Sequence, residues 1–331
     1  MPITQNFLNS AAQVSFTDAT AIDTFFTRQN MHDFISWFNT NAANKGFWSK
    51  SPSHAGISMA TDSTAHDRFN ELWSNEAIKT IFGKNSVSLL QFLSLQSIFN
   101  NETGGSLIPL TEGVGSSGHP GIAYAFDKIK NLKRSYNTLA GNKTCFDLFN
   151  DNNYNNAFQN LALGSQLKNT TNAVWKGEAY PQTVATSTKP AVTGYVLEAD
   201  FFKFRGRGFI QTTGRTNYSG IIDFVMKYAG NNPVILNMKT VWAKRSANLD
   251  VLATVSTNAE WDNLFQNSDL LIAARSVEVH NAASGDYLGK ITGTDPTAVS
   301  NSIRTMGKRI SGGDTYAALF LNRVTQIIEL L

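Results

Sequence analysis

The amino-acid sequence predicts a mainly α-helical fold with a small β element. Apolar residues recur at helical spacing in several segments, and between Ser86 and Phe99 they cover most sides of the helical wheel. One short stretch, residues 209–213, is β-rich and is flanked by glycines. With 331 residues, of which 42% are hydrophobic, the chain can bury a sizeable core in one large domain or two.

The first 85 residues are predicted to form a helical module. We expect helices over residues 18–29, which Asp18 can cap, over residues 32–44 and over residues 66–82. The large apolar side chains of these helices indicate a packed core rather than a platform for sugar rings. They are Phe34, Ile35, Trp37, Phe38, Phe69, Leu72, Trp73, Ile78 and Ile81.

The apolar helix that starts near Ser86 leads into a glutamate and a glycine turn. Glu102 is followed by Thr103 and then by two glycines, so we expect its carboxyl group where a buried helix ends. Partial desolvation favours the protonated form of a carboxyl group, which suits a general acid. Considered alone, however, the Glu-Thr-Gly-Gly motif is typical of a solvated glutamate before a helix stop.

A second motif runs from Phe204 to Tyr218 and is punctuated by glycines. If residues 209–213 form a strand, Gln211 and Thr213 share one face, because side chains alternate along a strand. That face is polar and fit to hold a substrate or a water molecule. The alternative is an ordinary edge strand followed by a basic turn.

The other residues of this motif extend the prediction. Thr212 is expected to face the protein interior, opposite to its two neighbours. A turn at Gly214 would bring Arg215 and Asn217 close to the polar face, because glycine permits a sharp bend at little steric cost. Helices are expected over most of the remaining chain, at residues 217–228, 268–282, 296–310 and 315–330.

Together, these two motifs resemble the glycoside hydrolase family 19 chitinases and their phage endolysin relatives, in the lysozyme-like superfamily. Two later segments are similar to that family as well: residues 272–281 to its core helix and residues 309–313 to its Ile-Asn-Gly-Gly turn. The resemblance implies a two-lobed fold with a sugar cleft and Glu102 as the general acid. It also implies a set of substrate-binding residues: Thr103, Gln211, Thr213, Arg215, Asn217, Tyr218 and Arg309.

The chain also departs from the family pattern. Asn101 stands where the family usually has a histidine, and Ser311 replaces the asparagine of the Ile-Asn-Gly-Gly turn. The stretch between the two motifs is long for the family, which implies an inserted lobe around residues 113–200. We therefore expect a helical module over residues 1–85 and a catalytic domain over residues 86–331.

The mechanism depends on a second carboxylate. Inverting glycosidases place a base roughly 6.5–9.5 Å from the acid, whereas retaining enzymes place it near 5 Å. Glu112 follows Glu102 by ten residues, a spacing similar to that of a second glutamate in phage endolysins of this type. Glu178, in the predicted inserted lobe, is the other candidate. We prefer Glu112, although a solvated loop glutamate is an alternative interpretation of either residue.

Three functions are compatible with the motifs. The first is a hydrolase that cuts the glycan strand of bacterial peptidoglycan, with Glu102 as the acid and Glu112 as the base. The second is a chitinase that acts on N-acetylglucosamine polymers, and the third is a non-catalytic glycan-binding or structural protein that kept the fold. The substitutions at Asn101 and Ser311 favour the third hypothesis, whereas the presence of Glu102 and Gln211 argues against it.

No cofactor or metal site is predicted. The histidines, His32, His54, His66, His119 and His280, do not have the spacing of zinc ligands. Cys145 is the single cysteine, so no intramolecular disulfide can form, which fits synthesis in a reducing cytoplasm.

The predicted partner is peptidoglycan or a related amino-sugar polymer, and not nucleic acid. The net charge of +3 and the pI near 8.8 are only mildly basic. We see no signal peptide and no membrane span in the sequence. A protein made in the cytoplasm that acts on the cell wall would need delivery by a holin, an injection apparatus or a phage particle.

Overall fold

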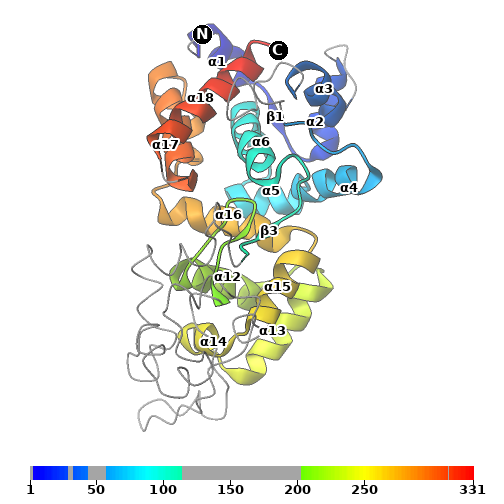
Figure 1. Ribbon diagram of the computed structural model, residues 1–331, viewed down its shortest axis with the longest axis vertical. Coiled ribbons are helices and arrows are strands. Elements are labelled where there is room, and N and C mark those ends of the chain that lie inside the picture. The colour runs from blue at the N-terminus through cyan, green and yellow to red at the C-terminus, as the bar shows by residue number, and fades with distance from the viewer. Residues whose placement is uncertain (1–2, 29–32, 44–56, 114–202, 312) are drawn as a thin grey trace, which may run out of the picture. The chain divides into compact units, whose positions relative to one another are not determined.

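The computed structural model describes residues 3–28, 33–43, 57–113, 203–311 and 313–331, and in this part of the chain the fold is mainly helical (Figure 1). The expected mainly α class with a small β element is confirmed, because strands form only two short two-stranded sheets among the described residues. The predicted inserted lobe, with Cys145 and Glu178, lies outside the described residues, as do His32, His54 and His119.

The chain divides into two compact units, each described here by itself. The first unit comprises Met1–Pro109, Gly208–Ile210 and Asp269–Leu331. The second comprises Leu110–Arg207 and Gln211–Ser268. The boundary expected at residue 85 falls inside the first unit.

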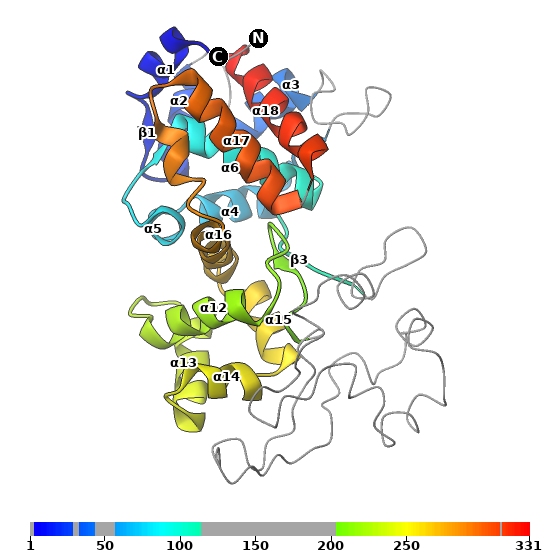
Figure 2. The ribbon, with the colours of Figure 1, turned by 90° about the vertical axis from the view of Figure 1, so that its left-hand side faces the viewer.

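Helices make up most of the first unit. In chain order its elements are α1 (Gln5–Ala11), β1 (Ser15–Phe16), α2 (Ala19–Arg28), α3 (Phe34–Asn41), α4 (Ser63–Leu72), α5 (Asn75–Phe82), β2 (Val87–Ser88), α6 (Leu89–Thr103), α16 (Leu271–Ala283), the 3-10 helix η4 (Gly289–Thr292), α17 (Pro296–Ser311) and α18 (Asp314–Ile328). Strands β1 and β2 pair antiparallel. Figures 1 and 2 show α17 and α18 side by side, with α18 against α6.

Local signals fix both ends of α6, the central helix of this unit. A capping box starts it, in which the Ser88 side chain accepts from the Gln91 backbone and the Gln91 side chain accepts from the Ser88 backbone. Gly104 ends it in the left-handed conformation, with φ of 60°, and its N–H bonds the Asn100 carbonyl. Because the side chains from Leu89 to Asn100 are all buried, the expected covered helix is confirmed.

An aromatic cluster joins α6 to the N-terminal helices. The Phe92 ring centroid lies 4.8 Å from that of Phe34 and 4.8 Å from that of Trp73. Phe16 and Phe26 also pack on Phe92, with centroids 5.6 and 6.2 Å away. All five rings are at most 2% exposed, so they form a core, as predicted, rather than a sugar platform.

The prediction of a single helix over residues 66–82 is wrong. The structure has two helices, α4 and α5, because the chain leaves the helical conformation at Trp73 and starts again at Ser74. The Ser74 hydroxyl accepts from the Ala77 backbone, so it caps a new helix. Apolar spacing continues across the break and masks it in the sequence.

Other predicted helices of the first unit are confirmed within a few residues. Helix α2 begins after Asp18, whose carboxylate accepts from the Ala21 backbone at 2.8 Å. Helices α16, α17 and α18 correspond to the predictions over residues 268–282, 296–310 and 315–330. Asp295 accepts from the Thr297 backbone at 2.9 Å and so contributes to the start of α17.

The second unit combines four helices and a short β pair in its described part. Its elements are β3 (Leu110–Thr111), β4 (Arg207–Gly208, of which Gly208 is assigned to the first unit), α12 (Arg215–Lys227), α13 (Pro233–Arg245), α14 (Leu249–Val255) and α15 (Asn258–Asn267). Helix α12 packs on α13 and α14, and α13 packs on α15. Of these four helices, only α12 corresponds to a helix predicted from the sequence, over residues 217–228.

The strand expected over residues 209–213 does not form. Arg207 and Thr212 instead exchange backbone hydrogen bonds of 3.2 and 3.0 Å, and residues 209–211 form a turn. Gln211 has a φ of 52°, a left-handed conformation that no extended strand contains. Nevertheless Thr212 is 1% exposed, while Gln211 and Thr213 are half-buried. The expected burial of Thr212 is therefore confirmed, although a turn and not a strand produces it.

Among the described helices, none combines the length and the hydropathy that a membrane crossing requires.

Candidate functional site

In the first unit, Glu102 occupies the last turn of α6 and is the one ionisable residue of that helix. Its side chain is half-buried, unlike the fully covered residues before it. The Asn101 side-chain amide donates a hydrogen bond of 2.8 Å to Glu102 Oε1. Asn101 therefore contacts the predicted general acid directly.

A buried arginine from the C-terminal helix holds Asn101 in turn. Arg323, on α18, is fully buried and donates a hydrogen bond of 2.8 Å to Asn101 Oδ1. Burial lowers the pKa of Arg323 to about 10, and the charges of Tyr316 and Glu102 oppose this shift. Since the Asn101 oxygen accepts from Arg323, its nitrogen is left to donate to Glu102. Arg323 was not predictable from the sequence, because 222 positions separate it from Asn101.

Thr103 has an internal role in this arrangement. Its hydroxyl donates to the Phe99 carbonyl at 2.7 Å and accepts from the Leu107 backbone at 3.1 Å. The side chain is 7% exposed. As placed here, Thr103 shapes the turn after the helix rather than presenting a free hydroxyl to a substrate.

In the second unit, Glu112 is held by backbone groups. Its N–H donates to the Gly206 carbonyl at 2.8 Å, and the Gly206 N–H donates to Glu112 Oε2 at 3.1 Å. Burial raises the pKa of the Glu112 carboxyl, and both the Gly206 hydrogen bond and the charge of Arg205 oppose this shift. The carboxyl is only partly exposed to solvent. A half-buried carboxyl with a raised pKa is a candidate for proton transfer.

The second unit also brings Gln211 beside Glu112. A Cβ atom on Gly206 would lie 2.6 Å from Gln211 Oε1 and 3.3 Å from Glu112 Oε2, so both side chains cover the same glycine. The Gln211 amide donates to the Leu110 carbonyl at 3.4 Å. Two residues predicted from separate motifs are therefore neighbours in this unit, and a glycine at position 206 leaves the space for them.

Three of the other predicted binding residues support the turn around Gln211. Thr213 donates from its hydroxyl to the Gln211 carbonyl at 2.7 Å, and Asn217 donates to the Thr213 carbonyl at 2.9 Å. Arg215 donates to the Thr254 hydroxyl at 3.1 Å, and its guanidinium lies 5.4 Å from the centroid of the Phe204 ring. All three side chains are half-buried, so each retains a solvent-facing part.

Tyr218 is fully buried, and it joins a polar network that the sequence analysis did not predict. Its hydroxyl donates to the Arg205 carbonyl at 2.6 Å and accepts from Arg207 at 2.9 Å. Arg207, also fully buried, pairs with Asp262 at 2.9 Å and donates to Asn258 at 2.6 Å. This network fixes the segment before the Gln211 turn. As placed, Tyr218 supports the site and does not line it.

Arg309, the last predicted binding residue, lies exposed on α17 in the first unit. Burial lowers the pKa of His280, the positive charge of Arg309 lowers it further, and a hydrogen bond with the Arg309 backbone opposes both effects. His280 also bonds the Tyr287 hydroxyl at 2.9 Å. The backbone of Ser311 ends α17, and the glycine after it lies outside the described residues.

Over the described ranges, no three histidine, cysteine, aspartate or glutamate side chains gather in a way that could hold a metal ion. Comparisons of the chain with protein-family models, with curated proteins and with solved structures found no match in any of the three.

Proposed function

We propose that this protein is a glycoside hydrolase that cuts the glycan strand of bacterial peptidoglycan, with Glu102 as its general acid. The observation that carries the proposal is the setting of Glu102, a half-exposed carboxyl at the end of a covered helix. Asn101 orients it, and the buried Arg323 orients Asn101. A proton donor must be held within hydrogen-bond reach of the leaving oxygen, and this arrangement supplies a fixed orientation.

Glu112 is the proposed base of the same reaction. A base acts in its ionised form, and burial raises the pKa of Glu112. Activity should therefore rise with pH as this carboxyl loses its proton. Gln211, which shares the space over Gly206, would hold the sugar or the attacking water through its amide.

The proposed reaction needs side-chain carboxyl groups and water and no cofactor. The proposed partner is a cell-wall polymer, with no role for nucleic acid. The protein would be made in the cytoplasm and act on the wall after release through a holin, an injection apparatus or a phage particle.

The products identify the bond that is cut. The protein is incubated separately with purified peptidoglycan and with N-acetylglucosamine oligomers, and the products are analysed by mass spectrometry. A new reducing end on muramic acid indicates a muramidase, and one on glucosamine indicates a glucosaminidase. An anhydro-muramic product would indicate a lytic transglycosylase, which needs one carboxylate. Turnover of the oligomers with intact peptidoglycan would overturn the proposal in favour of a chitinase.

The variant Glu102→Gln tests the proposed acid. Glutamine is nearly isosteric but cannot donate the proton, and general acid catalysis contributes about 10²–10⁴-fold. The matched control is Glu71→Gln, because Glu71 is also half-buried and also lies at the end of a helix of the first unit, α4. Cell-wall turbidity measures activity, and circular dichroism checks the fold. Loss of activity in both variants, or in neither, would contradict the assignment.

A further inference from the structure

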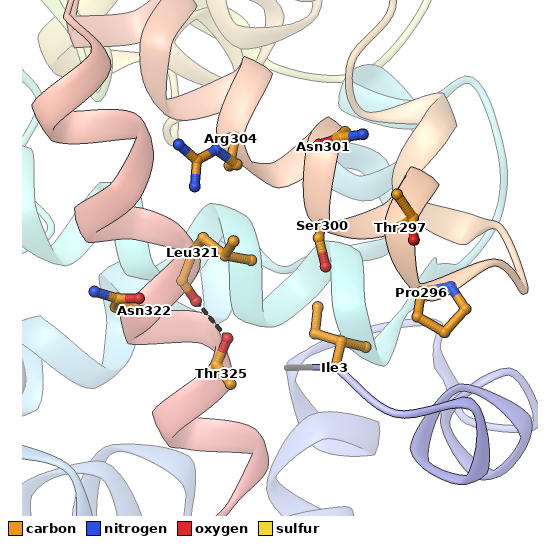
Figure 3. A pocket seen from close by; sticks show the side chains of 9 residues that line it. All are labelled: Ile3, Pro296, Thr297, Ser300, Asn301, Arg304, Leu321, Asn322 and Thr325. Carbon is orange, nitrogen blue, oxygen red and sulfur yellow. Dashed lines mark hydrogen bonds between the residues drawn. The ribbon is translucent and has the colours of Figure 1, made fainter. Parts of the chain in front are cut away.

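A groove lies along α17 and α18 in the first unit, and none of the predicted site residues lines it (Figure 3). Its volume is about 550 Å³, within the range of small-molecule sites. The lining residues are Ile3, Pro296, Thr297, Ser300, Asn301, Arg304, Leu321, Asn322 and Thr325. The α17 members repeat at helical spacing, so one face of that helix forms a wall of the groove.

Most polar side chains of this groove are not used by the fold. Thr325 donates its hydroxyl to the Leu321 carbonyl at 2.7 Å, the one bond drawn in Figure 3. Within the described part of the chain, five other lining side chains make no hydrogen bond or ion pair. They are Thr297, Ser300, Asn301, Arg304 and Asn322. Hydroxyl and amide groups both donate and accept, so they match a ligand rich in amide groups.

The charge of the groove favours an anionic ligand. Arg304 is the one charged residue in the lining, and it is exposed on α17. The nearby carboxylate of Asp314 pairs with Lys308 at 2.7 Å, and Lys308 is the main cause of the lowered pKa of Asp314, ahead of Arg304. Arg304 is therefore available for a ligand carboxylate, with which a guanidinium can form two parallel hydrogen bonds.

The apolar part of the lining favours a peptide over a sugar. Ile3, Pro296 and Leu321 contribute aliphatic surface that suits small side chains such as alanine methyl groups. None of the lining residues is aromatic, so the groove offers no ring on which a sugar face could stack.

We propose that the groove between α17 and α18 binds a short anionic peptide with small apolar side chains. Peptides of this chemistry are attached to the glycan of bacterial cell walls, and this choice of source rests on the proposed function. Binding here would anchor the protein to its polymer independently of the carboxyl groups that cut it.

Calorimetry with the full chain tests this site. The probe is N-acetyl-L-alanyl-γ-D-glutamyl-L-alanine, compared with the same peptide amidated at both carboxylates and with an N-acetylglucosamine tetramer. We expect the acidic peptide to bind with a Kd at or below about 1 mM. The amidated peptide should bind at least about tenfold more weakly, because charge-assisted hydrogen bonds are lost.

Substitutions locate the binding. Arg304→Gln should weaken binding of the acidic peptide at least about tenfold, and Arg304→Lys should restore part of it. The matched control is Lys79→Gln, which removes one exposed positive charge from α5, outside the groove, and should leave the Kd unchanged. Circular dichroism of each variant checks that the fold is kept.

Four outcomes would contradict the proposed peptide site. They are no binding of the acidic peptide, equal binding of its amidated form, equal Kd values for Arg304→Gln and Lys79→Gln, and stronger binding of the sugar tetramer. The assay needs no turnover, so it separates the two proposals. Peptide binding without glycan cleavage would support the peptide site and contradict the proposed hydrolase activity. Glycan cleavage without peptide binding would support the hydrolase activity and contradict the peptide site.

Discussion

The two candidate carboxyl groups are held in different ways. Glu102 receives a hydrogen bond from the side chain of Asn101, which the side chain of Arg323 fixes in turn. Glu112 exchanges hydrogen bonds with the backbone of Gly206 and has no comparable side-chain relay among the interactions described above. One carboxyl depends on a distant residue of the sequence, and the other depends on the shape of the local backbone.

This difference determines which substitutions should disturb each group. A side-chain relay is broken by removing any one of its members, including a member that cannot touch a substrate. A backbone clamp tolerates side-chain changes around it but not a larger residue at the glycine.

Gly206→Ala should break the backbone clamp. The added Cβ would lie 2.6 Å from Gln211 Oε1 and 3.3 Å from Glu112 Oε2, so the end of the Gln211 side chain must move and the Glu112 carboxyl must yield slightly. Both atoms are the ends of flexible side chains, so the loss of unfolding free energy should be at or below the lower end of the about 1–3 kcal/mol typical of overpacking. Cell-wall turnover should fall because both side chains are displaced. Urea denaturation measures the stability. Gly113→Ala is the control, because a Cβ at that position meets no atom within 4 Å. Equal stability of the two variants would show that Gly206 is not needed for close packing.

Arg323→Met should break the side-chain relay. Without the guanidinium, Asn101 loses its orientation, and a displaced proton donor can cost up to about 10²-fold in rate. We expect kcat to fall about 10- to 100-fold with little change in KM, because the contacts proposed between Glu102 and the substrate are not removed. Arg323→Lys, which keeps the charge, should recover part of the loss. A fall in the apparent kcat that merely follows a loss of folded protein, with KM unchanged, would indicate a structural role only.

Ionisation of Glu112 should lower the stability of the fold and raise the activity. Burial raises its pKa in the folded state, so ionisation destabilises the fold as pH rises from the unfolded-state pKa through the raised folded-state value. Glu112→Gln should therefore gain stability relative to the wild type as pH rises from below the unfolded-state pKa to above the raised folded-state pKa. Activity of the wild type should instead rise over the same window, because a base must lose its proton. Denaturation and turbidity at a series of pH values give both profiles, and a flat stability difference would exclude the raised pKa.

Smaller effects are expected at the Gln211 turn. Gln211→Ala and Thr213→Ala should each reduce turnover by a factor that corresponds to about 0.5–1.5 kcal/mol, the value of one hydrogen bond. Thr212→Val should leave turnover nearly unchanged, because Thr212 is buried and faces away from solvent. Steady-state rates and thermal melting distinguish activity from stability. Full activity of both alanine variants together with an inactive Thr212→Val would reverse the assignment of the exposed face.

Local features were predictable from the sequence. The apolar run before Glu102 and the glycines after it predicted both the covered helix α6 and its end, since these signals lie within the segment that they describe. Asp18 predicted the start of α2 for the same reason. Asn232 before Pro233 is a comparable local signal for the start of α13.

Features that depend on distant contacts were not predictable. The β-rich composition of residues 209–213 predicted a strand, but backbone bonds between Arg207 and Thr212 force a turn there. The contact between Asn101 and Arg323 joins positions far apart in the chain, and one sequence carries no signal that pairs them. Tyr218 was expected at a substrate because of its motif, and the network with Arg207 places it in the core instead.

The central claim is that Arg323 acts on the proposed reaction through Glu102, and the double variant tests it most directly. Turnover of peptidoglycan is measured for the wild type, Glu102→Gln, Arg323→Met and the combination. Residues that act as a unit are strongly non-additive, so the double variant should lose at most about tenfold more than Glu102→Gln alone. A double variant whose loss equals the product of the two single losses, or a fully active Glu102→Gln, would contradict the account.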